Sequence, residues 1–189
     1  MDFEQNFLNL KYLLEDTVSK CLRELLLFAF DKNVESLFEA ITNRLNENSH
    51  DLSKSDKTEI KKGHSKKSVT VLKIEVLCKI FRLGVVQDRT LTLLGADDNG
   101  KKDHIKNIEN IWTDDIIGNK DEEELSDEIY NQRCVELLEI SNYLIGDGNQ
   151  CLRDIGNKLK KAVDKIYEKD SQGIAALGIH GKPFTAGVE

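Results

Sequence analysis

The 189-residue chain has a single proline, and aromatic residues make up only 6% of it. Proline interrupts helices and strands alike, and aromatic side chains are among those that strands favour. A chain poor in both, with 39% hydrophobic and 32% charged residues, is typical of a helical protein rather than of a β-sandwich or a disordered segment. The sequence therefore predicts an all-α fold.

Closely spaced metal ligands are also lacking. The four cysteines, Cys21, Cys78, Cys134 and Cys151, are scattered, and three of them fall in apolar helical patterns, where a thiol is normally a small buried hydrophobe. None of the four histidines has a helical histidine or cysteine partner at ligand spacing. No glycine-rich phosphate loop is present, because "GADDNG" lacks the lysine and the preceding strand. We expect no disulfide framework, no metal and no cofactor.

No apolar run approaches the length of a membrane span. The first residues, "MDFEQNFLNLKYLLED", lack the basic start and the unbroken apolar core of a signal peptide. A cytoplasmic protein without a membrane partner is the expectation.

The chain has no excess of positive charge: its formal net charge is −7. This argues against a general affinity for nucleic acid, because phosphate binding is driven by Lys and Arg. Two groups of lysines would form an RNA-binding patch if they converged, although no aromatic residues interleave with them to stack bases. They are Lys61, Lys62, Lys66 and Lys67 in one segment and Lys160 and Lys161 in another.

Apolar residues recur at helical spacing along most of the chain. This spacing predicts helices over 3–30, 34–45, 69–83, 105–116, 126–145 and 152–166. Asp31 or Asn33 is the expected cap of the second helix, and Ser126 that of the fifth. Residues 51–68 are polar and broken by Gly63, which predicts a loop with at most a short helical turn. The result is one helical bundle of five or six main helices over residues 1–169, followed by an irregular glycine-rich tail over residues 170–189.

Strand and helix compete only in "SVTVLKIEVLCKIFRL". Its β-branched residues favour a strand. The apolar pattern from Val69 to Leu83 is too long for a typical strand, and it ends at Gly84, a good helix terminator. We predict a central buried helix here.

The first helix is apolar around much of its circumference near "CLRELLLFAF". A helix that is apolar on all sides must be covered by the bundle or by a partner. Four side chains are therefore expected either to form an interaction surface for a second chain or to belong to the core. They are Leu22, Leu26, Phe30 and Phe38.

Acidic residues cluster from Asp114 to Glu128. They resemble the carboxylate clusters that bind magnesium in all-α nucleotide pyrophosphatases. The simpler interpretation is that acids crowd the first turn of a helix because its dipole favours them, and that the others are solvated. The simpler interpretation is preferred, and a metal-dependent pyrophosphatase is a second alternative.

The order of elements resembles the HEPN-like domain of the DAZ-interacting zinc-finger ubiquitin ligase group. The resemblance covers roughly residues 8–168. It rests on "CLRELLLFAFD", "LFEAITNRLNE", "VTVLKIEVLCKIFRL", "LTLLGADDN", "HIKNIENIWTDDIIGN" and "LSDEIYNQRCVELLEISNYLIG". It implies an all-α bundle, often dimeric, from a group with metal-independent ribonucleases and with non-catalytic interaction or RNA-binding modules.

Catalytic members of that group carry an arginine and, four to six residues later, a histidine at the junction that corresponds to "IWTDDIIGN". Here the junction holds Trp112, Thr113, Asp114 and Asn119, with neither group present. The one match to the spacing, Arg44 to His50 in "RLNENSH", lies at the end of the second helix and is interpreted as a chance match.

These observations predict a non-catalytic helical protein-interaction module, an adaptor or dimerisation domain that acts as a homodimer. An RNA-binding module or a metal-independent ribonuclease is the first alternative.

Overall fold

The computed structural model describes residues 2–47, 50–87, 93–94 and 102–176, with side chains to residue 167. The described residues form an all-α bundle of seven continuous helices without a strand, one more helix than the upper limit expected. The elements are α1 (Phe3–Tyr12), η1 (Leu13–Val18), α2 (Ser19–Ala29), α3 (Val34–Glu47), α4 (Lys54–Lys66), α5 (Ile74–Arg82), α6 (His104–Asn110), η2 (Ile111–Ile117), α7 (Asp127–Ile145) and α8 (Gln150–Ala176).

The first helix runs without interruption through α1, η1 and α2, as predicted, but η1 is a π-helical segment. A π segment accommodates one extra residue in a helical turn. The Ser19 hydroxyl donates to the Leu14 carbonyl oxygen, 2.8 Å away and five residues earlier in the chain. This bond helps to satisfy the backbone where the α-helical ladder changes register.

The π segment keeps the buried face of the helix in line. The buried pair Leu13 and Leu14 recurs at Cys21 and Leu22, eight residues later, whereas an α-helix repeats after about seven. The wider turn of the π segment takes up the extra residue, so both pairs stay on the same side of the helix. Along this helix α1 packs on α7 and η2, while α2 packs on α3, α5 and α8.

The predicted loop at residues 51–68 is wrong, because α4 occupies most of it. Ser53 and Asp56 form a capping box, in which the Ser53 hydroxyl accepts from Asp56 N and Asp56 Oδ2 accepts from Ser53 N, a strong helix start. Gly63 does not break the helix. A Cβ at this position would lie 2.7 Å from Phe38 Cζ, so the glycine lets α4 approach α3 closely.

The predicted helix over 69–83 is correct only from Ile74 onward. Lys67 ends α4 with a left-handed backbone conformation (φ 51°), and the next residues form the connection between α4 and α5. The Arg23 guanidinium holds this connection by donating to the Leu72 carbonyl oxygen, with Nη2 at 2.7 Å. Gly84 (φ +76°) follows the end of the helix, as expected.

The remaining predicted helices are confirmed. The side chains of Asn33 and Ser126 cap α3 and α7 by accepting from Ser36 N and Ile129 N. The helix that begins at His104 ends in a second π segment, η2, closed by a 2.9 Å bond from Gly118 N to Thr113 O. The last helix, α8, continues past the predicted boundary at residue 169 to Ala176. The rest of the predicted tail, residues 177–189, lies outside the described residues.

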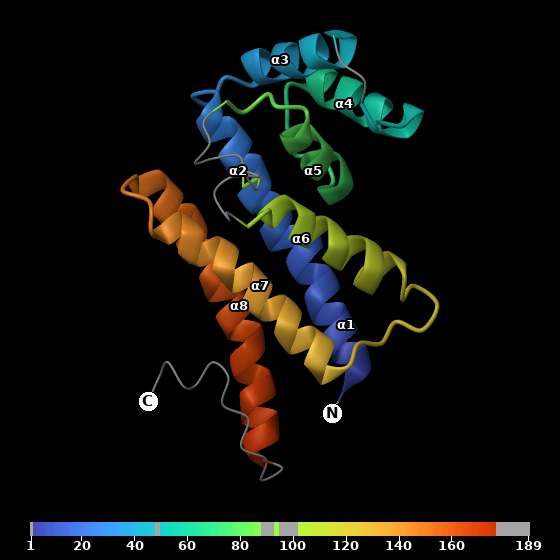
Figure 1. Ribbon diagram of the computed structural model, residues 1–189, viewed down its shortest axis with the longest axis vertical. Coiled ribbons are helices and arrows are strands. Elements are labelled where there is room, and N and C mark those ends of the chain that lie inside the picture. Colours follow the sequence, from blue (N-terminus) through green and yellow to red (C-terminus); the bar gives the residue numbers. More distant parts are fainter. Residues whose placement is uncertain (1, 48–49, 88–92, 95–101, 177–189) are drawn as a thin grey trace.

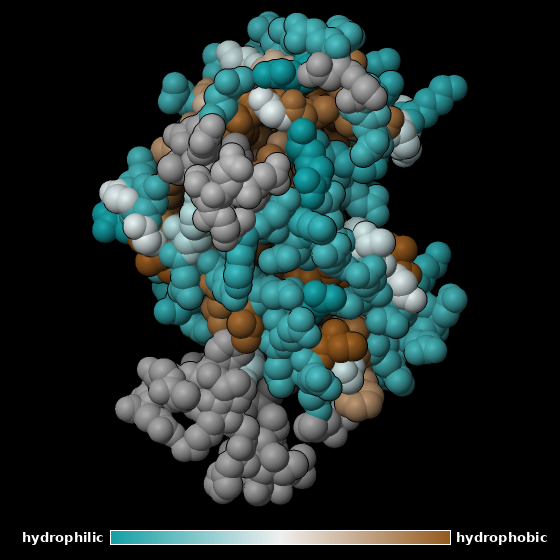
Figure 2. All heavy atoms as spheres, viewed as in Figure 1, coloured by the Kyte–Doolittle hydropathy of each residue, from teal (hydrophilic) through white to brown (hydrophobic). Residues whose placement is uncertain are grey.

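The long first helix is the centre of the arrangement in Figure 1. α3, α4 and α5 gather around its α2 end, and the antiparallel hairpin of α7 and α8 runs along its side with α6 between the two groups. Hydrophilic side chains cover most of the face drawn in Figure 2, and hydrophobic ones reach its surface in separate patches. None of the helices in the described ranges combines the length and the apolar character needed to cross a bilayer.

The first prediction concerns the contact between α7 and α8. A Cβ on Gly156 would lie 2.8 Å from the Ser141 carbonyl oxygen and 3.0 Å from Leu144 Cβ. We expect Gly156→Ala to lower the free energy of unfolding by about 1–3 kcal/mol through overpacking, although alanine favours a helix by about 1 kcal/mol. Chemical denaturation measures the difference.

Gly148→Ala is the matched control, because a Cβ there meets no atom within 4 Å. Its stability should stay within about 0.5 kcal/mol of the parent. A Gly156→Ala protein as stable as the parent would contradict the close approach of the two helices.

Candidate functional site

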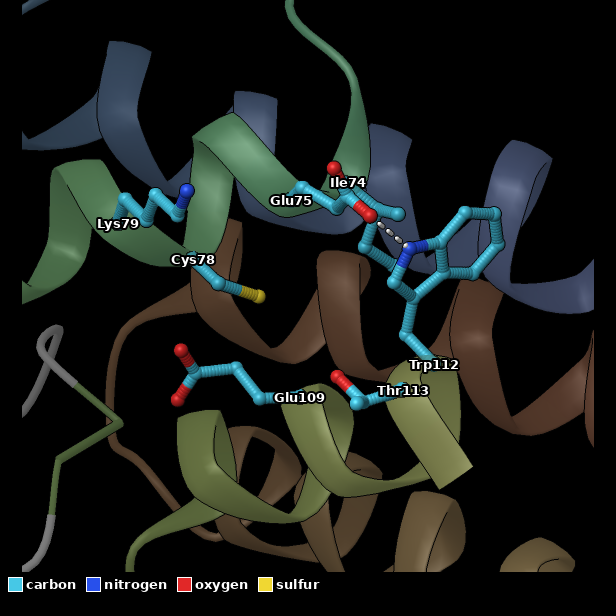
Figure 3. Close-up of a pocket in the computed structure, with 7 residues that line it drawn as sticks. All are labelled: Ile74, Glu75, Cys78, Lys79, Glu109, Trp112 and Thr113. Carbon is cyan, nitrogen blue, oxygen red and sulfur yellow. Dashed lines mark hydrogen bonds between the residues drawn. The ribbon is translucent and has the colours of Figure 1, made fainter. Parts of the chain in front are cut away.

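A small pocket lies between α5 and the helix formed by α6 and η2 (Figure 3). Its volume is about 230 Å³, below the range of about 300–1,000 Å³ that is usual for small-molecule sites. The residues that line it are Ile74, Glu75, Cys78, Lys79, Glu109, Trp112 and Thr113. They stand one helical turn apart on each element, which places them along the facing surfaces of the two helices.

The charged groups of this pocket are already engaged. Trp112 points its indole toward α5, and its Nε1 donates to Glu75 Oε1 at 2.7 Å. Lys79 Nζ lies 2.6 Å from Asp56 Oδ2. Glu109 accepts from Arg82 Nε at 2.8 Å, and this hydrogen bond raises the pKa of Arg82. Each carboxylate or ammonium group is held by a partner rather than directed at a ligand.

The thiol of the pocket belongs to Cys78, which is 2% exposed. Burial raises the pKa of this thiol far above its ordinary value, and the nearby carboxylate of Glu109 raises it further. A reactive cysteine requires the opposite shift. The pocket therefore has neither an activated nucleophile nor a free general base.

The predicted degenerate junction lies beside this pocket. Trp112 and Thr113 line it, whereas Asp114 is exposed. Asn119 Nδ2 donates to the Asp115 carbonyl oxygen at 3.1 Å. The junction residues thus serve helix packing and the end of η2.

An arginine does reach this junction, from α7. Arg133 Nε lies 2.5 Å from Asp115 Oδ2, and its Nη1 lies 3.0 Å from Glu136 Oε2. Burial raises the pKa of Asp115, although the Arg133 guanidinium acts in the opposite direction. Two carboxylates neutralise this arginine, so it is not available to bind a phosphate. Sequence reasoning missed the pair because 18 residues separate its members.

The pair Arg44 and His50 is not assembled into a site. His50 lines a hollow of about 510 Å³ with Lys79, Arg82 and Glu109, and Arg44 is not among the lining residues. His50 Nδ1 accepts from Leu52 N at 3.3 Å. The ring is therefore held by the backbone just before the N-cap of α4.

The acidic run does not converge either. Residues 121–124 are exposed, and Asp127 Oδ1 accepts from Asn6 Nδ2 at 2.8 Å. Within the described part of the chain, no three His, Cys, Asp or Glu side chains are placed to share a metal ion.

The two groups of lysines lie on different elements. Lys61, Lys62, Lys66 and Lys67 belong to α4 or its C-cap, and Lys160 and Lys161 to α8. α4 packs on α3 and α5, whereas α8 packs on α7, α2 and η1, and the two helices lie at opposite ends of Figure 1. The structure does not bring the two groups together.

The four residues expected as core or interaction surface lie at the α2 end of the bundle. Leu22, Leu26 and Phe38 are each 0% exposed, and Phe30 packs partly buried against the same core. These residues fill the protomer's own core and do not form an exposed patch.

The two most exposed large apolar residues of the described chain, Leu8 and Tyr12, lie instead in a groove between α1 and α8. The groove has a volume of about 540 Å³. Leu8 and Tyr12, one turn apart on α1, are 51% and 64% exposed. The residues that line it are Gln5, Leu8, Asn9, Tyr12, Leu13, Asp16, Thr17, Ala162, Lys165 and Ile166. We call this surface the α1–α8 groove.

Comparison with known proteins adds no relative, since the chain matches no family model, no curated protein and no solved structure.

The second prediction tests the Arg133 and Asp115 pair. Arg133→Leu leaves the Asp115 carboxylate buried without its partner, so we expect it to lower the free energy of unfolding by about 3–5 kcal/mol at pH 7. The double variant Asp115→Leu, Arg133→Leu should be more stable than the single variant, because no charge is left uncompensated. Urea denaturation of both proteins measures the difference.

The pH dependence of Arg133→Leu has a fixed sign. Burial raises the pKa of Asp115 above its value in the unfolded chain, which is about 3.9. The Arg133→Leu variant should therefore keep its free energy of unfolding below about pH 4 and lose it as the pH rises, because the Asp115 carboxyl ionises at a lower pH in the unfolded chain than in the folded one. Arg82→Leu is the control: its pair with Glu109 is more exposed, and we expect a loss of at most about 1 kcal/mol. An equal loss of unfolding free energy in Arg133→Leu and Arg82→Leu would contradict the assignment of Arg133 and Asp115 as a buried ion pair.

Proposed function

We propose that this chain is a non-catalytic helical protein-interaction module that associates with a second copy of itself, as an adaptor or dimerisation domain. The observation that carries the proposal is the α1–α8 groove. Leu8 and Tyr12 are more than half exposed on it, whereas the large apolar residues of α2 and α3 are buried in the core or packed partly buried against it.

The composition of the groove favours a protein surface as its occupant. Leu8, Tyr12 and Ile166 supply apolar contact area, and a tyrosine offers both a ring and a hydroxyl, which suits it to interfaces. The neutral polar groups Gln5 and Asn9 form a hydrogen bond of 2.8 Å with each other. Such a mixture of apolar centre and polar border is usual at protein interfaces.

The charge of the groove favours a second copy. Its two ionised residues are Asp16 and Lys165, which cancel, although the whole chain carries −7. Two copies that meet here avoid the repulsion that their net charges produce elsewhere. In a two-fold arrangement each surface contacts itself, so Lys165 of one protomer can face the Asp16 carboxylate of the other.

The resemblance to HEPN-like domains agrees with this proposal, because that group includes non-catalytic and dimeric members. The lack of the arginine and histidine pair at residues 112–119 supports an inactive domain. The neutralised Arg133 and the protonated thiol of Cys78 support it as well.

The third prediction concerns the oligomeric state. The parent protein should be a dimer at micromolar concentration in sedimentation or light-scattering measurements. Tyr12→Asp and Leu8→Asp place a charge in the groove, and each should weaken the dimer by about 30-fold, equivalent to about 2 kcal/mol. Both residues are exposed, so unfolding of the protomer should change by less than about 0.5 kcal/mol.

Val135→Asp is the matched control. Val135 is 40% exposed on the outer side of α7 and does not line the groove. It adds the same charge to an apolar surface position and should leave the dimer intact. A parent protein that is monomeric up to 100-fold higher concentration, or a dimer that all three variants weaken equally, would overturn the proposal.

The fourth prediction concerns activity. We expect no cleavage of single-stranded or structured RNA, with or without divalent metal, because residues 112–119 contain neither the arginine nor the histidine of the catalytic HEPN-like members. RNA cleavage that disappears in His50→Ala would revive the displaced pair. Metal-dependent nucleotide hydrolysis that disappears in Glu124→Gln would favour the pyrophosphatase alternative instead.

A further inference from the structure

The outward half of α4 carries positive charge only. Successive residues of an α-helix are 100° apart, and the buried side of α4 holds Asp56, Ile60 and Gly63. The opposite side presents lysines and hydroxyl groups without an acid. Its residues are Lys54, Ser55, Lys57, Thr58, Lys61, Lys62, Ser65 and Lys66, of which Lys57 is half-buried and the others are exposed. We call this surface the α4 lysine face.

The acids near this face are engaged elsewhere. Asp56 Oδ2 accepts from Lys79 Nζ on α5 at 2.6 Å. Glu59, at the edge of the face, accepts from Lys73 N at 3.2 Å. Glu35 of α3 lies 2.8 Å from the His64 ring nitrogen Nε2. The α4 lysine face therefore keeps its charge, and none of its ammonium groups forms an ion pair with a described carboxylate.

Helix stability does not explain this distribution. Like charges at i,i+4 destabilise a helix by about 0.2–0.5 kcal/mol per pair, and the face contains two such pairs, Lys57 with Lys61 and Lys62 with Lys66. A helix face that is only solvated usually mixes both signs of charge. The face is also rigid, because α4 is capped at both ends and its buried side packs on Phe38.

We propose that the α4 lysine face binds the phosphate backbone of a double-stranded nucleic acid. A duplex offers about one negative charge per 1.7 Å, and displaced counterions drive its binding to lysines. The 13 residues of α4 span about 20 Å, enough to follow several phosphates. Contacts of this kind are independent of base sequence.

Two competing ligands fit the face less well. Single strands are usually held by aromatic side chains that stack on the bases, and the α4 lysine face has none. A helix that binds a membrane surface inserts an apolar side, whereas the apolar side of α4 is packed within the protein. Hydrophilic residues form the outer edge of the end of the molecule built by α3 and α4, with some hydrophobic atoms visible below them (Figure 2). The α1–α8 groove shares no residue with this face, so the proposal stands apart from self-association.

The fifth prediction is the binding experiment, done on the full chain with fluorescently labelled 20-base-pair duplexes of RNA and of DNA. Both should bind, with a logarithmic salt dependence of slope up to about −4.5 if all five lysines contact phosphate. Lys61→Gln with Lys62→Gln should reduce the slope by about 1.8 and weaken binding about tenfold or more at low salt.

Lys160→Gln with Lys161→Gln is the matched control. It removes the same charge from two adjacent, exposed lysines of a helix, but on α8, and should leave the binding slope unchanged. Lys57→Glu separates binding from folding: it creates a favourable i,i+4 pair with Lys61, so unfolding should become no easier while duplex binding falls.

Several outcomes would overturn the proposal. One is an equal loss of duplex affinity in the two double variants. Another is unchanged duplex binding in Lys61→Gln with Lys62→Gln. A third is tighter binding to a single strand than to a duplex. Binding to phosphatidylserine vesicles in preference to both duplexes would assign the face to a membrane surface instead.

Discussion

Burial of the apolar side chains along one long helix is the constraint on which the rest of the structure depends. Leu10, Leu14, Leu22 and Leu26 are all fully buried. Different neighbours cover the two ends of this helix. α7 and η2 pack on α1, whereas α3, α5 and α8 pack on α2. What this arrangement leaves exposed, the α1–α8 groove and the outer side of α4, is where the proposed functions lie.

Periodicity and capping residues were sufficient to predict most helices. Where they failed, long-range contacts decided the local structure. α4 has few apolar residues, and its only glycine looks like a helix breaker, yet Gly63 is the residue that allows contact with Phe38. Residues 69–73 continue an apolar pattern, but the Arg23 guanidinium holds their backbone in a connection. Neither contact can be recognised from residues that are neighbours in the sequence.

At the candidate site, the sequence indicates the residue types but not their contacts. That residues 112–119 contain no arginine and no histidine can be read from the sequence, whereas the approach of Arg133 to Asp115 depends on how α7 packs. The apolar residues near "CLRELLLFAF" suggested an interface, but α3, α5 and α8 pack on this part of the helix and enclose Leu22 and Leu26 in the core. Leu8 and Tyr12 are exposed because α8 passes beside them without covering them, which only the packed structure reveals.

The single extra residue of η1 also affects how this chain would align with related sequences. A relative that lacked it would align with this chain through a one-residue gap in the middle of a helix, a place where gaps are normally penalised. Its first helix would be α-helical throughout, and the apolar residues on both sides of the gap would keep the same face, because the deletion removes the extra residue and the wide turn together. Two chains that differ in length at this segment could therefore assemble the same neighbours around the same helix. A gap at this place would not count against a common architecture.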